Sequence, residues 1–162
     1  MKKYKWIIIL VNLIILLGVF NNSIVKKERL RSDGQLILLE LVPVDPRSLM
    51  QGDFMRLSYA ISSNVNSDSI SKRGFCVVKL EENGVGKKVR IQDERSPLNE
   101  NEHLIEYTSA SWSGINIGAE SFFFQEGDAE KYEDAKYGGV KVDQRGNSLL
   151  IGLYDEHRIE IE

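Results

Sequence analysis

The sequence predicts a mostly β domain, a small barrel or sandwich, behind a single N-terminal transmembrane helix. Three observations support this. An apolar run from Trp6 to Phe20, interrupted only by Asn12 and Gly18, follows three lysines. Beyond that run, no stretch of useful length repeats its apolar residues every 3.6 positions, as an amphipathic helix would. Short segments that alternate apolar and polar residues occur there instead, separated by Gly, Asn and Asp, which is the pattern of strands and turns.

The apolar run is the basis for a membrane anchor. A helix from Trp6 to Phe20 spans only about 22 Å, whereas a helix that continues to Val25 covers a hydrocarbon core of about 30 Å. We therefore expect residues 1–25 to form a transmembrane anchor. A cleaved signal peptide is the alternative. Bulky Phe20 and polar Asn21 stand where cleavage needs small residues, so an uncleaved signal-anchor is favoured.

Basic residues flank the anchor on both sides. Three lysines precede it, and four basic residues follow it, so the positive-inside count is nearly balanced. We expect the N-terminus inside and the domain outside, because anchors with a short basic tail usually insert that way. Residues 26–34 then form a basic juxtamembrane stem. Its residues Lys26 to Arg31 would lie along anionic headgroups, which attract them.

The charge of the remaining chain excludes one class of partner. The formal net charge is -3, but from Ser32 onward 14 basic residues face 23 acidic ones. Such a domain would be repelled by phosphates, so we expect no nucleic-acid partner. Cys76 is the only cysteine, which excludes an intramolecular disulfide, and we expect it to be a small buried hydrophobe. No Cys/His spacing indicates a metal site, and we expect no cofactor.

The domain, residues 35–162, follows a turn at Ser32-Asp33-Gly34. Its first segment, QLILLELVPV, predicts a buried strand that ends at Pro43. The next strand, FMRLSYAI, places Met55, Leu57, Tyr59 and Ile61 on one face. The crossing between these strands is PVDPRSLMQGDFMRLSY. Its two prolines and its Gly-Asp turn restrict the backbone more than any other stretch of the sequence, and we expect the crossing to fix the register of the barrel.

Hairpins and loops make up the rest. GFCVVKLEENGVGKKVRIQ predicts a hairpin around Glu-Asn-Gly, with Cys76, Val78 and Leu80 alternating on one arm and Val89 and Ile91 on the other. LIEYTSASW and GAESFFFQEG predict strands, and GDAEKYEDAKYG a single helical turn or an open loop. GGVKVDQRGNSLLIGLYD predicts a second hairpin that turns near Arg145-Gly146-Asn147, and HRIEIE closes the chain with alternation.

The segment QGDFMRLSY resembles the motif that names the GDYXXLXY family, bacterial membrane-associated proteins of unknown function. Gly52, Asp53, Leu57 and Tyr59 match, and Phe54 stands where the name has tyrosine, which keeps the ring and loses the hydroxyl. The resemblance extends upstream through PVDPRSL and downstream through FFFQEGDAEKYEDAKYGGVKVD, and so covers essentially the whole domain. It implies a segment in the bacterial cytoplasmic membrane, a β-rich domain and multi-pass membrane proteins encoded nearby. It implies no activity.

Several residues of the crossing have two readings. Gly52-Asp53 fits a turn in which the aspartate caps nearby amides. Asp45-Pro46-Arg47 with Asp53 and Arg56 fits a structural ion-pair network or a ligand clamp, because the rigid fork of arginine suits either. A sensor of a small ligand or ion would have a pocket lined by Arg47, Arg56 and Tyr59. The resemblance implies a structural motif whose residues are Asp45, Pro46, Gly52, Asp53, Phe54, Leu57, Tyr59, Gly127 and Asp128.

A second resemblance concerns layout. Type I signal peptidases also carry an N-terminal anchor and an external β domain, and their catalytic serine lies eight residues before a Gly-Asp that begins a strand. MQGDFMRL and, later, Gly127-Asp128 are similar to two of their motifs, but Val44 holds the position eight residues before Gly52. Ser48 with Lys87 or Lys88 is the remaining Ser/Lys candidate. We expect both lysines to be exposed and charged on the hairpin arm, so the resemblance implies a non-catalytic version.

Aromatic and acidic residues suggest an interaction surface. Phe122, Phe123 and Phe124 are consecutive, so at least one ring must point away from the core. The densest acidic cluster lacks the spacing of a calcium loop, and we expect a solvated loop. We therefore predict a non-catalytic, membrane-anchored domain that binds or stabilises a multi-pass membrane protein through the Phe122–Phe124 region and this loop. A Ser/Lys hydrolase and a ligand or ion sensor are the alternatives. The acidic cluster comprises Glu120, Glu126, Asp128, Glu130, Glu133 and Asp134.

Overall fold

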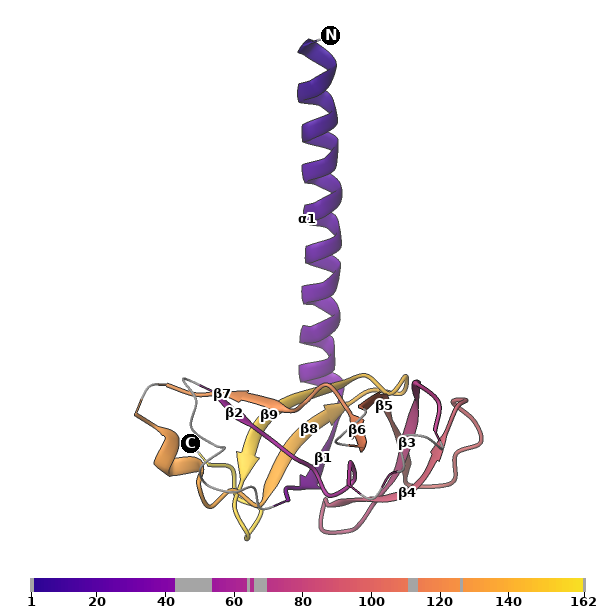
Figure 1. Ribbon diagram of the computed structural model, residues 1–162, viewed down its shortest axis with the longest axis vertical. Helices are drawn as coiled ribbons and strands as arrows, with labels where there is room; N and C mark the ends of the chain where they lie inside the picture. The colour runs from indigo at the N-terminus through magenta and orange to yellow at the C-terminus, as the bar shows by residue number, and fades with distance from the viewer. Residues whose placement is uncertain are drawn as a thin grey trace.

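A single long helix stands on a β domain. The computed structural model describes residues 2–42, 54–63, 65, 70–110, 114–125 and 127–161. Helix α1 (Lys2–Asp33) projects from the domain, and the strands that follow it form a curled half-barrel (Figure 1). The expected mostly β domain behind one N-terminal helix is confirmed. Of the predicted small barrel or sandwich, the structure shows a half-barrel.

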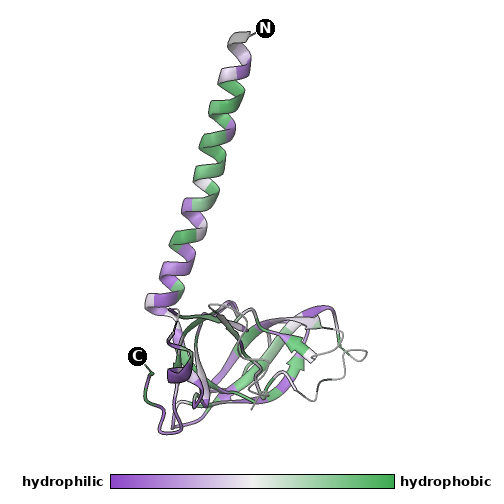
Figure 2. Cartoon of the chain, turned by 60° about the vertical axis from the view of Figure 1, so that its left-hand side comes forward, coloured by the Kyte–Doolittle hydropathy of each residue, from purple (hydrophilic) through white to green (hydrophobic). Residues whose placement is uncertain are grey.

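Helix α1 is the candidate membrane span. It is long and apolar enough to cross a bilayer, and its side chains from Tyr4 to Val25 are exposed. Figure 2 shows hydrophobic residues along the middle of the helix and hydrophilic ones on the turns next to the domain. The helix continues without a break through the basic stem. The turn expected at Ser32-Asp33-Gly34 is therefore reduced to a bend at Gly34.

Leu30 attaches the helix to the domain. It is the one buried residue among the described side chains of α1, with 7% of its surface exposed. The Gly34 N–H donates a hydrogen bond to the Leu30 carbonyl at 3.0 Å. A Cβ atom at Gly34 would collide with that carbonyl oxygen, so the tight bend requires glycine. Helix and domain thus meet at a packed joint, with α1 against β8 and β9.

The described strands form three antiparallel sheets. One has the order β1-β8-β9: β1 (Gln35–Glu40), β8 (Tyr137–Val142) and β9 (Ser148–Tyr154). The second has the order β4-β3-β5-β6: β4 (Gly86–Gln92), β3 (Arg73–Leu80), β5 (Glu102–Ala110) and β6 (Gly114–Asn116). The third is a short ribbon of β2 (Phe54–Arg56) and β7 (Ser121–Phe123). A 3-10 helix, η3 (Ala129–Tyr132), follows the ribbon.

Single links join the sheets into the half-barrel. Leu38 of β1 forms an isolated parallel bridge to Val85, just before β4, and Leu41 forms an antiparallel bridge to Tyr59. The Glu106 N–H of β5 donates to the Gly146 carbonyl in the β8–β9 turn at 2.8 Å. A closed barrel needs a continuous ring of ladders. Isolated bridges take the place of ladders at these joints, which is why the barrel stays open.

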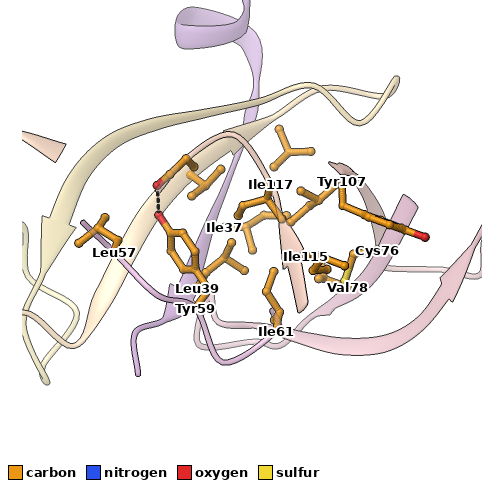
Figure 3. Packing of buried hydrophobic residues seen from close by; sticks show 14 of the residues in the cluster. Ile37, Leu39, Leu57, Tyr59, Ile61, Cys76, Val78, Tyr107, Ile115 and Ile117 are labelled. Atoms are coloured by element: carbon orange, nitrogen blue, oxygen red, sulfur yellow. Dashed lines mark hydrogen bonds between the residues drawn. The ribbon is translucent and has the colours of Figure 1, made fainter. Parts of the chain in front are cut away.

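The core lies inside the half-barrel. Met55, Leu57, Tyr59 and Ile61 are all buried in it, so the prediction that they share the core face is confirmed. The strand that carries them is shorter than predicted, because β2 ends at Arg56 and the chain continues irregularly. Figure 3 shows Leu57, Tyr59 and Ile61 in one cluster with side chains of β1, β3, β5 and the β6 region. The other fully buried members include Ile37, Leu39, Cys76, Val78, Ile105, Tyr107, Ile115, Val140 and Leu153.

The first predicted hairpin forms, but one of its residues, Val89, faces solvent instead of the core. Cys76 and Val78 are buried as predicted, but Val89 is 48% exposed. The register shifts between Val77 and Val78, so that Val77 pairs with Arg90 and Val78 pairs with Lys88. Val89 is the extra residue of this bulge and turns outward. The expectation that Val89 faces the core is therefore wrong.

The later elements agree with the sequence except at the end of the chain. Strand β5, the helical turn η3 and the β8–β9 hairpin all form where predicted. The described residues of HRIEIE, 157–161, do not form a strand. It makes a single bridge between Glu160 and Tyr154, and Ile159 is exposed. A turn in which the Asp155 carboxylate accepts the N–H groups of His157 and Ile159 holds this segment instead.

An ion pair holds the loop between β4 and β5. The Arg90 guanidinium lies 2.8 Å from the Glu102 carboxylate and donates a further hydrogen bond to the Pro97 carbonyl at 2.7 Å. The same carboxylate accepts the backbone N–H and the side-chain amide of Asn99. Arg90 and these amides lower the pKa of Glu102 to about 2. The ion pair thus stabilises the fold only while Glu102 is ionised.

Replacement of Glu102 by glutamine should reduce the acid sensitivity of the domain. The folded-state pKa lies below the unfolded value of about 4.3, so the carboxylate contributes stability above that pH and loses it as the pH falls toward 2. We expect E102Q to lower the Tm at pH 7 by roughly 2–6 °C. Between pH 5 and 3, the Tm of E102Q should fall less than the Tm of the parent. Thermal unfolding in detergent measures this. E100Q is the matched control, and equal pH slopes for E102Q and the parent would contradict the assignment.

Candidate functional site

Much of the crossing between β1 and β2 lies outside the described residues. The structure therefore does not test the roles predicted for this part, and they stay predictions. The described part of the motif begins with the backbone of Phe54. The residues outside it are Asp45, Pro46, Arg47, Ser48, Gly52 and Asp53.

Tyr59 is the buried centre of the described part. Only 1% of its surface is exposed, and its hydroxyl donates a hydrogen bond to the Ala119 carbonyl at 2.6 Å (Figure 3). Burial, together with the nearby Glu120 carboxylate, raises the pKa of Tyr59, so the phenol remains a donor. Its ring packs on Gly138 of β8, where a Cβ atom would lie 2.8 Å from the ring.

Backbone hydrogen bonds fix the segment on both sides of Tyr59. The Val42 N–H donates to the Ser58 carbonyl at 2.8 Å, and the Ala60 N–H donates to the Glu40 carbonyl at 2.9 Å. On the other side, the Leu57 N–H donates to the Glu120 carbonyl at 2.8 Å. The segment therefore connects the end of β1 with the chain that leads into β7.

Comparison with known proteins identifies the motif. The model of a protein family described as GDYXXLXY protein matches residues 16–153. The chain belongs to the GDYXXLXY family. Neither the curated proteins nor the solved structures include a match to it. In this family member, the leucine and the final tyrosine of the motif, Leu57 and Tyr59, are core residues.

Arg56 and Tyr59 lie in different environments. Arg56 is exposed, whereas the side chain of Tyr59 fills the core and its hydroxyl is already bonded. The described part of the chain does not bring them together around an open space. A ligand-binding role for them together with Arg47 and Asp53 stays a prediction, because both of the latter lie outside the described residues.

The three phenylalanines divide between core and surface. Phe122 pairs with Met55 in the β2–β7 ribbon and packs on the core. Its ring lies 4.9 Å from that of Tyr132 in an edge-to-face arrangement, and the Phe124 ring lies 5.8 Å from the same tyrosine. Phe123 points to the other face and is 74% exposed. The expectation that at least one ring leaves the core face is confirmed.

Acidic residues surround this aromatic group on one side. Glu130, Glu133 and Asp134 are exposed on and after η3, beside Tyr132. Asp128 lies 3.3 Å from Lys131, and the Gly127-Asp128 turn leads into η3 with a positive φ of 93° at the glycine. Glu120 turns back to accept the Ile117 N–H. Across the described ranges, no three Asp, Glu, His or Cys side chains converge on a metal position; Glu126 lies outside those ranges.

The two lysines of the hairpin arm differ. Lys87 is exposed and lies 2.8 Å from Glu81. Lys88 pairs with the core residue Val78, so it lies on the inner face, and it is half-buried. Its amine donates to the Ser63 carbonyl at 2.9 Å. The expectation of an exposed Lys88 is wrong, because the bulge at Val77 and Val78 turns this residue inward.

One feature near Lys88 escaped the sequence analysis. Within the described part of the chain, the buried Ser62 hydroxyl has no hydrogen-bond partner. Cys76 lies on the same inner face, and burial raises the pKa of its thiol to about 11, opposed only in part by Lys88. The prediction of a buried Cys76 is confirmed. At neutral pH the thiol is therefore protonated and shielded.

Sequence reasoning also missed Tyr132 and Leu30. Tyr132 is the only aromatic residue in the acidic segment EGDAEKYEDAK, and Leu30 is the only large apolar residue in KKERLRSD. An isolated apolar residue in a charged segment is the signal that could have found both. The first supports Phe122 and Phe124, and the second docks the helix.

A double-mutant cycle tests the packing of Tyr59 on Gly138. Y59F should cost about 1–3 kcal/mol, because it leaves the Ala119 carbonyl without its buried partner. G138A should also destabilise, because its methyl group would collide with the ring. The cycle itself combines Y59L with G138A. In the double variant, the smaller leucine leaves room for the methyl group that G138A introduces, which the tyrosine ring does not. We therefore expect the double variant to lose less stability in denaturant unfolding than the two single losses together. Strict additivity would contradict the contact.

Proposed function

We propose that this protein is a non-catalytic, membrane-anchored domain that binds a multi-pass membrane protein through the β2–β7 ribbon. The observation that carries the proposal is the exposure of Phe123, at 74%, on a rigidly supported ribbon. Aromatic residues are enriched in the centres of protein interfaces, where they contribute a large share of the binding energy.

The surroundings of Phe123 support an interface. Its neighbours Phe122 and Phe124 are held by Tyr132, so the ribbon is ordered before a partner arrives. The exposed carboxylates of Glu130, Glu133 and Asp134 lie beyond that tyrosine. An apolar centre beside a charged margin is the usual anatomy of a protein interface. A partner that fits would present an apolar pocket next to basic residues.

The position of the ribbon supports a membrane protein as that partner. Figure 1 shows β2 and β7 at the end of the domain from which α1 leaves. With α1 in the bilayer, the ribbon would lie close to the membrane surface. We place the N-terminus inside and the domain outside the bacterial cytoplasmic membrane, on the basis of the lysines that precede α1 and the family membership.

Site-specific photo-cross-linking tests the interface in intact cells. A photoreactive phenylalanine analogue in place of Phe123 should give an adduct with a multi-pass membrane protein that mass spectrometry identifies. The same analogue at Val89, which is also exposed but lies on the four-stranded sheet, is the control and should give no such adduct. External protease should digest the domain of the adduct, as the proposed orientation requires.

A second measurement separates an interface from mere proximity. F123S should reduce recovery of the cross-linked partner in affinity capture from detergent by tenfold or more, which corresponds to about 1.4 kcal/mol. V89S should leave the recovery unchanged. Recovery of the tagged parent chain alone, as a monomer without an adduct at position 123, would overturn the proposal.

One observation favours a second candidate, a Ser/Lys hydrolase. A lysine that acts as a base must be shielded from water so that it can lose its proton. Lys88 is half-buried on the inner face, whereas Lys87 is exposed and paired with Glu81. If this candidate is right, Lys88 is the base and Ser48 the nucleophile.

A serine-reactive phosphonate probe tests that candidate. If this candidate is right, the probe labels the parent chain at Ser48, S48A and K88M abolish the labelling, and K87M retains it, because Lys88 is half-buried whereas Lys87 is exposed. Circular dichroism controls for folding of K88M. Absence of labelling in the parent chain would exclude this candidate and leave the binding proposal unaffected.

A further inference from the structure

The register of the strands defines which loops lie at the membrane end of the domain. β1 starts directly after α1, and Gln35 pairs with Val142, so the β8–β9 turn that follows Val142 lies at the helix end. Glu106 of β5 bonds to Gly146 of that turn. Figure 1 shows the same arrangement: the β8–β9 turn and one end of the β3–β5 pair lie level with the base of α1.

Exposed basic residues gather at this end. Arg145 lies in the β8–β9 turn, and Arg95 lies with its guanidinium 5.7 Å from the ring of Phe75. A Cβ atom at Gly146 of the turn would lie 3.1 Å from that ring, so the ring lies beside the turn. Arg73 begins β3 opposite Thr108, and the Ser109 N–H donates to the carbonyl of Lys72. We call these four residues, Lys72, Arg73, Arg95 and Arg145, the basic rim. All four are exposed.

The opposite end of the domain is acidic. β1 ends at Glu40, which pairs with Tyr137, and the C-terminal segment bonds back to Tyr154 there. Among the described residues, that end carries more acidic than basic side chains. In the described part of the helix end, the stem of α1 and the basic rim together hold eight basic residues, four in each. Six acidic residues lie there, namely Glu28, Asp33, Asp93, Glu94, Glu106 and Asp143. The acidic residues of the far end include Glu40, Glu81, Glu82, Glu100, Asp155, Glu156 and Glu160.

We propose that the basic rim of the domain, together with the stem Lys26–Arg31, binds the anionic phospholipid surface and holds the domain upright on the membrane. This inference goes beyond the proposed function and does not depend on it. The span ends near Val25, and the eight helical residues that follow cover about 12 Å. That length carries the chain through the headgroup layer and places the basic rim directly beneath it.

The packed joint at Leu30 makes the charge distribution effective. A flexible linker would let an acidic domain drift away from an anionic surface. Because Leu30 is buried against the domain, the domain cannot rotate freely about the end of α1. The orientation of the helix in the bilayer therefore makes the basic rim face the lipid. Each basic residue near the surface adds to the attraction between the protein and anionic lipid. The acidic far end is roughly 30 Å away for a domain of this size, several screening lengths at physiological salt, so its repulsion is weak.

Headgroup quenching in nanodiscs tests the proposal on the full chain. A fluorophore is placed on Q144C in the exposed β8–β9 turn, and Cys76 is spared because it is buried and protonated. The discs contain a headgroup-linked quencher in either zwitterionic phosphatidylcholine or a mixture with phosphatidylglycerol. We expect quenching to be roughly twofold stronger in the anionic discs and to fall to the zwitterionic value in about 1 M salt.

Charge reversal separates the rim from net charge. The variant K72E/R73E should lose most of the difference between the two lipids. The matched variant K79E/K136E makes the same change in net charge away from the rim, on exposed residues, and should keep the difference. Equal quenching of the parent chain in both lipids, or an equal loss in both variants, would overturn the proposal. The lipid and salt comparison on the parent chain decides the matter even if a variant folds poorly.

Discussion

The buried side chain of Tyr59 holds three distant parts of the half-barrel together. Its ring fills the space left by Gly138 on β8, its hydroxyl reaches the Ala119 carbonyl before β7, and its backbone forms the bridge to Leu41 after β1. An unpaired carbonyl or hydroxyl in this position would carry the full desolvation penalty. The position therefore needs a ring of this size and a hydroxyl at its tip.

The same contact positions the surface that we propose for a partner. Leu57, two residues before Tyr59, bonds to Glu120, and β7 begins at the next residue. The β2–β7 ribbon is only three residues long on each strand, too short to be stable alone. Anchored by the Tyr59 segment on one side and by Tyr132 on the other, it presents Phe123 on a fixed support. The core and the exposed phenylalanine thus belong to one arrangement.

A second constraint acts at the base of the helix. The bend at Gly34 and the burial of Leu30 join α1 to the sheet of β1, β8 and β9. Because the joint is fixed, the direction of α1 determines the orientation of the domain. The joint places the ribbon and the basic rim at the same end of the domain, the end from which α1 leaves (Figure 1). Protein contact and lipid contact could then act at neighbouring places on one surface.

The sequence by itself determined the local elements. The apolar run from Trp6 to Phe20, a buried strand after it, two hairpins around Gly-containing turns and the inward facing of Met55, Leu57, Tyr59 and Ile61 all follow from patterns that operate within a few residues. The split of Phe122, Phe123 and Phe124 between core and surface follows from the same period of two. These features depend on neighbours along the chain, so composition and spacing are sufficient to predict them.

Only the tertiary structure decided the rest, because it depends on residues far apart in sequence. One bulge at Val77 and Val78 turned Val89 outward and Lys88 inward, and no local pattern marks a bulge. The burial of Leu30 depends on β8 and β9, more than 100 residues later. The basic rim combines residues from two hairpins that single bonds bring together. The half-barrel stays open because its sheets meet at isolated bridges, a property of the assembled strands rather than of any one of them.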